Sequence, residues 1–163
     1  GGAVFDGQRG NFGGIGGIGV EPITYVPARP EDREVLFALN KALIDRYENV
    51  EAIDYATVLA WTERKLEKRV EEYTRICLGG TVAGYYHLIP GAEKTELDDF
   101  YILPPYRGRG IGTRALKDCI QRATGPLFLY VFSRNAGAIR LYERMGFQIT
   151  ETVGETRCIM ERN

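Results

Sequence analysis

Apolar residues recur with two different periods along this chain. Short runs rich in β-branched and aromatic residues, typical of strands, alternate with longer stretches in which apolar residues return every three or four positions, as on one face of a helix. The runs predict strands at residues 23–26, 75–78, 81–89, 95–103, 127–132, 147–152 and 157–161. The three-and-four spacing predicts a helix that begins at Pro30 and further helices at about 55–73, 110–124 and 136–145.

The connections between these elements predict one α/β domain. Gly79-Gly80 joins two strand runs as a two-residue hairpin would. A helix between strands 95–103 and 127–132 indicates a crossover connection, so these two strands are predicted to run parallel within a mixed sheet. A chain of 163 residues has the usual size of one domain. We therefore expect, over residues 21–163, a mixed sheet of six or seven strands flanked by about four helices.

Glycine dominates the first segment of the chain. Residues 1–19 contain nine glycines and few apolar groups at any fixed period, which predicts a flexible arm at residues 1–20. Gly14, Gly16 and Gly19 spell the dinucleotide-binding pattern G-x-G-x-x-G. That pattern needs a strand before it and a helix directly after it, whereas here a glycine tract precedes and a strand follows. The sequence therefore argues against a dinucleotide site.

The composition is that of an ordinary globular protein. The formal net charge is −1, so neither nucleic acid nor an anionic membrane is expected as a partner. Cys77, Cys119 and Cys158 are odd in number and lie in or beside apolar runs, which favours reduced thiols and a cytoplasmic protein. No cysteine or histidine cluster has metal-ligand spacing, so no metal is expected. The charged run Glu63–Glu72 is interpreted as a solvated helix face with i,i+4 ion pairs.

Glycine and arginine crowd the junction between strand 95–103 and the helix that follows. The segment reads Pro104-Pro-Tyr-Arg107-Gly108-Arg109-Gly110-Ile111-Gly112. Backbone N–H groups at a helix start point out of the helix end and attract anions, and glycine lets a phosphate approach them. Arg107 and Arg109 add positive charge. The segment predicts an anion site, with a glycine-rich turn carrying solvated arginines as the alternative.

Two blocks in this part of the chain resemble one known superfamily. Arg107-x-x-Gly110-x-Gly112 resembles the coenzyme A pyrophosphate motif of the GNAT superfamily of acyl-coenzyme A dependent N-acetyltransferases. The run Asn135-x-x-Ala138-x-x-Leu141-Tyr142-Glu143-x-x-Gly146-Phe147 resembles the second conserved block of that superfamily, in the same order and spacing. The resemblance implies the GNAT fold and transfer of an acetyl group from acetyl-coenzyme A (acetyl-CoA) to an amine by direct attack in a ternary complex.

The resemblance also implies where acetyl-CoA lies. In the family, the strands that correspond to 95–103 and 127–132 splay apart, and the pantetheine arm lies in the gap like a substitute strand. A backbone N–H near Ile102 would polarise the thioester carbonyl. By position, the expected cofactor-binding residues are Phe100, Tyr101, Ile102, Leu103, Arg107, Gly108, Arg109, Gly110, Ile111, Gly112, Thr113, Asn135, Ala138 and Tyr142.

The family comparison suggests Tyr142 as the proton donor to the departing thiolate. The reference pKa of tyrosine, near 10, lies only about 1.5 pH units above that of a thiol. The alternative for Tyr142 is a core residue of an amphipathic helix. Asn135 is expected to cap its helix, bind the cofactor, or do both. His87, the single histidine, is interpreted as a satisfied structural group because it has no triad partner in the sequence.

Carboxylates on strand 95–103 are candidates for the general base. Glu96 stands eleven residues before Arg107, where some family members carry a glutamate that deprotonates the amine through water. Glu96 and Asp98 are the expected acid–base pair, and solvated edge carboxylates are the alternative. Simple alternation places Glu96, Asp98 and Phe100 on one face and Leu97, Asp99 and Tyr101 on the other.

The acceptor amine is less defined by the sequence. The family's acceptor wall corresponds to the first two helices and their link, which here carries Glu48, Glu51 and Asp54. These charges favour a cationic small-molecule, peptide or protein amine, and a hydrated loop explains them equally well. The two motif blocks would also fit a non-catalytic acyl-CoA sensor, or a transferase that uses a longer acyl donor. A homodimer is a candidate assembly.

Overall fold

Seven strands and four α-helices make up residues 21–163, the part of the chain that the computed structural model describes. The expected arm at residues 1–20, with Gly14, Gly16 and Gly19, lies outside the described residues. The elements are β1 (Ile23–Pro27), α1 (Arg33–Tyr47), α2 (Tyr55–Arg69), β2 (Thr74–Leu78), β3 (Thr81–Pro90), β4 (Thr95–Ile102), α3 (Ile111–Arg122), β5 (Leu127–Phe132), α4 (Ala136–Arg144), β6 (Gln148–Val153) and β7 (Arg157–Arg162). Short 3₁₀ helices span Pro30–Asp32, Val70–Glu72 and Pro104–Tyr106.

Local sequence signals explain where the helices begin. Asp54 caps α2 by accepting a hydrogen bond from the Thr57 N–H at 3.1 Å, and Asn135 caps α4 by accepting one from the Ala138 N–H at 3.2 Å. The first helix differs from the prediction, because Pro30 opens a single 3₁₀ turn and α1 starts only at Arg33. Each predicted strand is present to within a residue or two of its predicted ends.

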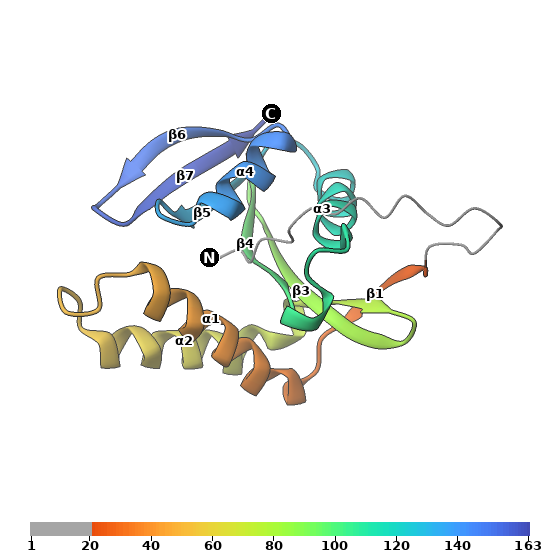
Figure 1. Cartoon of the computed structure of the whole chain (residues 1–163), viewed down its shortest axis with the longest axis horizontal. Helices are drawn as coiled ribbons and strands as arrows, with labels where there is room; N and C mark the ends of the chain where they lie inside the picture. Colours follow the sequence, from red (N-terminus) through yellow and green to blue (C-terminus); the bar gives the residue numbers. More distant parts are fainter. Residues whose placement is uncertain (1–20) are drawn as a thin grey trace.

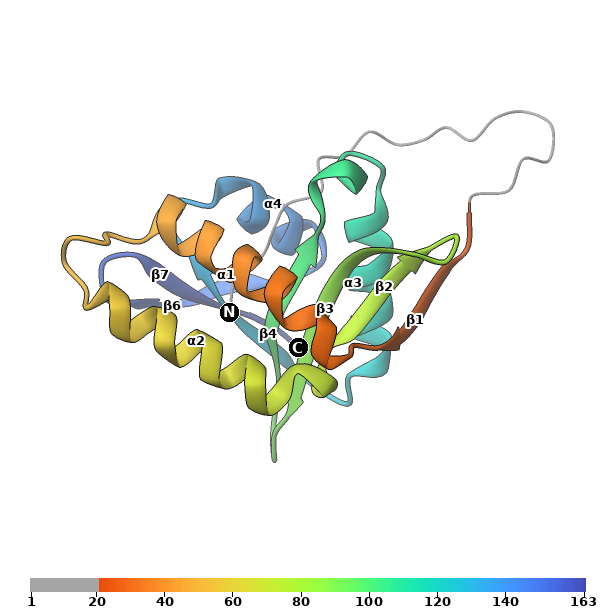
Figure 2. The same cartoon turned by 90° about the horizontal axis from the view of Figure 1, so that it is seen from below.

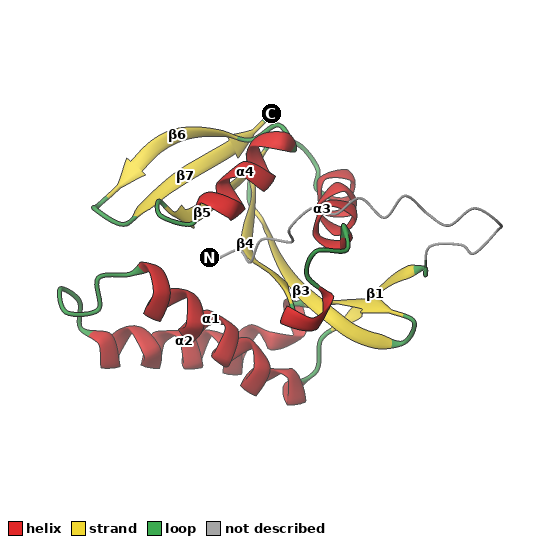
Figure 3. Cartoon of the chain, in the orientation of Figure 1, coloured by secondary structure: helices red, strands yellow, loops and turns green. Residues whose placement is uncertain are grey.

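The strands form one mixed sheet in the order β1-β2-β3-β4-β5-β7-β6. Among these neighbours, only β4 and β5 are parallel, as the crossover through α3 predicted. Helices α1 and α2 lie side by side on one face of the sheet (Figure 2), and α3 and α4 lie on the other (Figures 1 and 3). The structure confirms the predicted α/β class and the mixed sheet.

Two apolar clusters hold the helices on the sheet. One joins α3 and α4 to the sheet through residues such as Leu116, Leu141 and Phe100. The other joins α1 and α2 to the opposite face through residues such as Leu36 and Leu66. Burying a large apolar side chain stabilises a fold by roughly 1.5–3 kcal/mol, so each cluster anchors its helix pair firmly. Cys77, Cys119 and Cys158 are buried free thiols, as predicted.

The parallel strands β4 and β5 separate soon after they begin. Thr95 pairs with Leu127 and Glu96 with Phe128, and the described strands show no pairing between β4 and β5 beyond these positions. From there β4 follows β3 as far as Ile102, while β5 follows β7 (Figure 1). The two strands diverge because each keeps its antiparallel partner. The predicted splay is therefore present.

A β-bulge at Asp98 overturns the predicted alternation of β4. His87 of β3 pairs with Asp99 and Leu88 pairs with Leu97, so Asp98 is the extra residue on β4. An extra residue in one strand places two successive side chains on the same side. The corrected faces are Leu97, Phe100 and Ile102 toward α3, and Glu96, Asp98, Asp99 and Tyr101 toward α1 and α2.

None of the helices in residues 21–163 is long and apolar enough to cross a membrane.

Candidate functional site

The segment between β4 and α3 has the backbone of an anion cradle. Gly108 and Gly110 have φ angles of +76° and +75°, in the left-handed region that favours glycine. Gly110 occupies the N-cap position of α3, and no side chain of residues 21–163 caps this helix. First-turn N–H groups have no acceptor within a helix, so the start of α3 offers donors to a negatively charged group.

A buried hydroxyl lies at the third position of α3. Thr113 Oγ1 is the buried side-chain atom without a hydrogen-bond partner among the described residues. Leaving such a group unsatisfied costs about 1–3 kcal/mol, and an orphaned polar atom in a native fold calls for an explanation. A ligand oxygen bound at the start of α3 would explain the unsatisfied Thr113 hydroxyl. A Cβ built on Gly110 would meet no atom of residues 21–163 within 4 Å.

The two arginines of the cradle are placed differently. Arg107 Nε donates to the Ile102 carbonyl at 3.0 Å and so ties the loop to the end of β4. The Arg109 guanidinium lies 5.6 Å from the centre of the Tyr106 ring. Arg107 therefore shapes the loop in addition to contributing its charge.

The backbone of β4 presents an N–H group to the splay. The Leu103 N–H donates to the Ala83 carbonyl of β3 at 2.7 Å. Because successive N–H groups along a strand alternate in direction, the Ile102 N–H points away from β3 and toward the gap beside β5. This is the donor position expected from the sequence.

Tyr142 lies between α4 and the core. Its side chain is 2% exposed and packs edge-on against Phe147, with ring centres 5.5 Å apart. Burial raises the pKa of Tyr142 above the usual tyrosine value, so the hydroxyl keeps its proton at neutral pH. Of the other residues expected here, Asn135 caps α4, and Ala138, Phe100 and Ile102 are completely buried, so contact with a ligand would involve their backbone. Tyr101 is also buried, and it lines the pocket on the α2 side of β4.

A buried ionic cluster lies on the α2 side of β4. Lys65 Nζ, from α2, is 3.0 Å from Asp98 Oδ2 and 3.0 Å from Asp99 Oδ2. Both aspartates are buried. Tyr73 donates a short hydrogen bond to Asp99 Oδ2, and Tyr101 donates to Asp99 Oδ1 at 3.2 Å. The bulge makes the cluster possible, because it turns two adjacent carboxylates toward one lysine.

His87 extends this cluster toward solvent. Its Nδ1 is 2.8 Å from Asp98 Oδ2, its Nε2 is 3.2 Å from Glu72 Oε1, and its ring stacks on Tyr73. His87 is completely buried, so it is the satisfied structural group that was predicted. The run Glu63–Glu72 is not simply a solvated face, because Lys65 and Glu72 both bind groups on the sheet.

The carboxylates of β4 differ in their electrostatics. Burial alone would raise the pKa of Asp98, but its hydrogen bond with His87 and the charge of Lys65 hold that pKa well below the usual range. Burial, and then the negative charge of Asp98, raise the pKa of Glu96. Glu96 is therefore the better proton acceptor of the predicted pair, and Asp98 is a permanent negative charge beside it.

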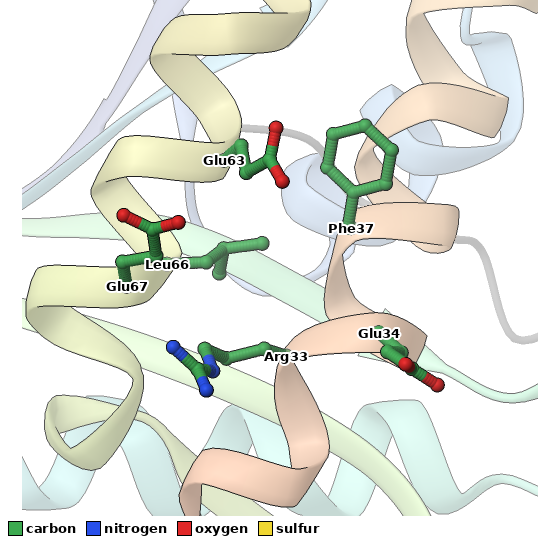
Figure 4. A pocket seen from close by; sticks show the side chains of 6 residues that line it. All are labelled: Arg33, Glu34, Phe37, Glu63, Leu66 and Glu67. Carbon is green, nitrogen blue, oxygen red and sulfur yellow. The ribbon is translucent and has the colours of Figure 1, made fainter.

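A pocket of about 270 Å³ opens on this side of the splay. Its wall combines residues of α1 and α2 with Tyr101 of β4, Phe132 of β5 and Arg157 of β7. A second hollow, of about 320 Å³, lies between α1 and α2 (Figure 4). Its lining residues are Arg33, Glu34, Phe37, Glu63, Leu66 and Glu67. No predicted site residue is among them, so the pocket at the splay is the candidate acceptor site.

Comparison with known proteins identifies the family. The sequence model of the Acetyltransferase (GNAT) family matches residues 36–147, which is more than half of the chain. The chain belongs to this family. The matched residues include β4, β5, the glycine-rich segment before α3 and the block around Tyr142.

Related proteins support the assignment over shorter stretches. The chain is 32% identical over 105 residues to an uncharacterized N-acetyltransferase of Methanocaldococcus jannaschii, covering 57% of this chain and 46% of that protein. It is 42% identical over 82 residues to the spermine/spermidine N(1)-acetyltransferase of Bacillus subtilis, covering 42% of this chain and 54% of that protein. The matched regions span about half the length of these curated relatives.

A solved N-acetyltransferase structure shares the fold. The PaiA N-acetyltransferase from Thermoplasma acidophilum, determined in complex with coenzyme A, superposes with a TM-score of 0.64 at 23% identity. The alignment covers 87% of this chain and 99% of that one. The likeness extends over the GNAT fold described above.

Sequence reasoning missed Lys65, Tyr73 and Glu72 as parts of the site. Lys65 and Glu72 lie in a charged helical run that reads as solvent-exposed, and their partners are more than ten residues away in the sequence. The available signal was the adjacent pair Asp98-Asp99, since two neighbouring carboxylates on a buried strand require a cation.

Proposed function

We propose that this protein transfers an acetyl group from acetyl-CoA to a primary amine. The observation that carries the proposal is the splay between β4 and β5, which has the α3 cradle with its orphaned Thr113 hydroxyl at one end and the pocket on its α2 side. Family membership supports the same reaction. Bound acetyl-CoA would supply an activated acetyl thioester.

The residues present fit acetyl-CoA. The start of α3, from Gly108 to Thr113, holds the pyrophosphate through backbone N–H groups and the Thr113 hydroxyl. The edge of β4 that faces the splay, up to Leu103, would hold the pantetheine by strand-like hydrogen bonds. The Ile102 N–H would donate to the thioester carbonyl and stabilise negative charge there.

The proposed transfer uses two proton-moving side chains. The acceptor ammonium first loses one proton to solvent, and the neutral nitrogen then bonds to the acetyl carbon. Glu96 takes, through water, the second proton that this nitrogen sheds. The carbon–sulfur bond breaks, and Tyr142 gives its proton to the departing sulfur. Burial raises the pKa of Tyr142, but the same dry surroundings also raise the pKa of the thiol. The pKa values of Tyr142 and of the thiol therefore stay close to each other. Tyr142 regains its proton from solvent as the products leave.

Acetyl-CoA binding tests the placement of the cradle. Wild-type protein should bind acetyl-CoA in isothermal titration, and Gly110→Val should weaken binding at least about tenfold, because a branched side chain at positive φ distorts the cradle and covers its amides. Gly154→Val is the matched control, since Gly154 has φ +60° and open space in the β6–β7 turn. Equal losses in both variants would contradict the placement, and no wild-type binding would contradict the proposed function.

The pH profile tests Glu96 as the base. Because burial and Asp98 raise the pKa of Glu96, kcat/KM should fall on the acidic side with a midpoint above the usual glutamate value. Glu96→Gln should lower kcat/KM by about 10²-fold and remove this acidic limb. Glu93→Gln, at an exposed glutamate in the β3–β4 turn, is the control. An unchanged acidic limb in Glu96→Gln would assign the base to another group.

A further inference from the structure

The pocket on the α2 side of the splay is mainly apolar. Tyr101 and Phe132 form its floor on the sheet. The apolar side chains of its helical wall and link are Leu43, Ile44, Ile53, Val58 and Trp61, and its polar ones are Asn40, Glu48, Thr62 and Lys65. An apolar pocket with a few polar groups takes a ligand that has an apolar body and one reacting polar group.

Trp61 is the most exposed of these apolar residues. Its side chain, on α2, is 61% exposed although it lines the pocket. A large aromatic ring left open to water gains free energy when a ligand covers it. Trp61 therefore suits an acceptor that carries an aromatic or branched aliphatic group.

The acidic wall that the sequence indicated does not form. Asp54 is occupied as the N-cap of α2, and Glu51 lies outside this pocket, in a hollow at its rim. Glu48 lines the pocket, but its Oε1 accepts a hydrogen bond from Thr156 Oγ1 at 2.6 Å. Of the three acidic residues only Glu48 lines the pocket, so this link gives the pocket one negative charge and not three.

The two cationic residues of the pocket, Lys65 and Arg157, also disfavour a polyamine acceptor. Lys65 is balanced by Asp98 and Asp99. Arg157 has no carboxylate within ion-pair distance among residues 21–163, and its guanidinium lies 5.9 Å from the centre of the Tyr130 ring. A second ammonium group on the acceptor would be repelled by Arg157.

The α1–α2 link is joined to the opposite half of the molecule. Arg134 Nη2 donates to the Tyr47 carbonyl at 2.9 Å, and Thr156 donates to Glu48. These contacts bridge one end of the pocket, between the C-terminal end of α1 and the loops that follow β5 and β6. A bridged pocket of this size suits a small molecule better than a side chain on a folded protein.

We infer that the acceptor is a small primary amine with a single positive charge and an aromatic or branched apolar body, and not a polyamine. This inference rests on the proposed acetyl transfer. It differs from the polyamine specificity that the name of the Bacillus subtilis relative states for that protein. The apolar body lies against Trp61 and its neighbours, and the amine points toward Glu96 and the splay.

The test compares matched amines at saturating acetyl-CoA by release of free thiol. The probes are 2-phenylethylamine, spermidine and ethanolamine. We expect kcat/KM for 2-phenylethylamine to exceed that for spermidine at least about tenfold, since burial of one ring is worth about that factor. A higher kcat/KM for spermidine would overturn the inference and leave the proposed function standing, whereas no thiol release with any amine would overturn the proposed function.

Three variants test the pocket, one of them as a control for general damage to the fold. Trp61→Ala should lower kcat/KM for 2-phenylethylamine about tenfold and leave ethanolamine within about twofold, because only the larger amine covers the ring. Lys68→Ala, at an exposed position on the same helix, should change neither. Arg157→Gln should raise kcat/KM for spermidine several-fold relative to wild type. Equal losses for both amines in Trp61→Ala would overturn the placement of the apolar body.

Discussion

Lys65→Met is expected to lower the free energy of unfolding by about 3–5 kcal/mol at neutral pH. The lysine is the cation that bonds to both Asp98 and Asp99, at 3.0 Å each, and both aspartates are buried. Methionine keeps the length of the side chain but leaves two adjacent carboxylates without that cation. Removing one partner of a buried ion pair destabilises more than removing a surface charge does. Urea unfolding at pH 7 measures the change.

The effect should depend on pH. The pKa of Asp98 is lowered in the fold, so its stabilising contribution is present above the unfolded pKa, about 4, and is lost as the pH falls through the folded value. Burial would lower the pKa of Lys65, but Asp99 and Asp98 raise it, so its contribution is lost only as the pH rises above about 10. The gap between wild type and Lys65→Met should therefore narrow as the pH falls below about 4 and Asp98 takes up a proton.

Lys68→Met is the control for the stability experiment. Lys68 is an exposed lysine on the same helix, three residues away, so its replacement should change the unfolding free energy by less than about 0.5 kcal/mol. If Lys65→Met also cost less than about 1 kcal/mol, the cluster would behave like a surface ion pair and its burial would have no energetic role.

Tyr142→Phe is expected to lower kcat by about 10²-fold and to leave the dissociation constant of acetyl-CoA within about twofold. Phenylalanine keeps the ring that packs against Phe147 and removes only the hydroxyl proposed to protonate the departing sulfur. Pre-steady-state thiol release and titration of acetyl-CoA measure the two quantities separately.

Tyr86→Phe provides the comparison for Tyr142. Tyr86 is a buried tyrosine of β3 in the same apolar cluster, and its ring lies 6.0 Å from that of Tyr25. Its replacement should leave kcat within about twofold. A parallel loss of kcat and of acetyl-CoA affinity in Tyr142→Phe would make Tyr142 a packing residue.

The amino-acid sequence by itself determined the elements, the order of their types and the family. The period-2 and three-and-four patterns depend on neighbouring residues, so the run Leu127–Phe132 was predicted with its observed ends. The glycine cradle was equally visible, because Gly108 and Gly110 adopt a left-handed backbone that few other residues tolerate.

Only the tertiary structure decided which groups meet at the site. The bulge at Asp98 depends on the register between β3 and β4, and it turned Asp98 and Asp99 to one face where simple alternation had separated them. Lys65 reaches those carboxylates from a helix more than thirty residues earlier. In the acidic link, Asp54 caps α2, Glu51 lies at the rim of the pocket and Glu48 bonds to Thr156. Contacts between distant segments depend on how elements pack in three dimensions, and local residue patterns carry no record of that packing.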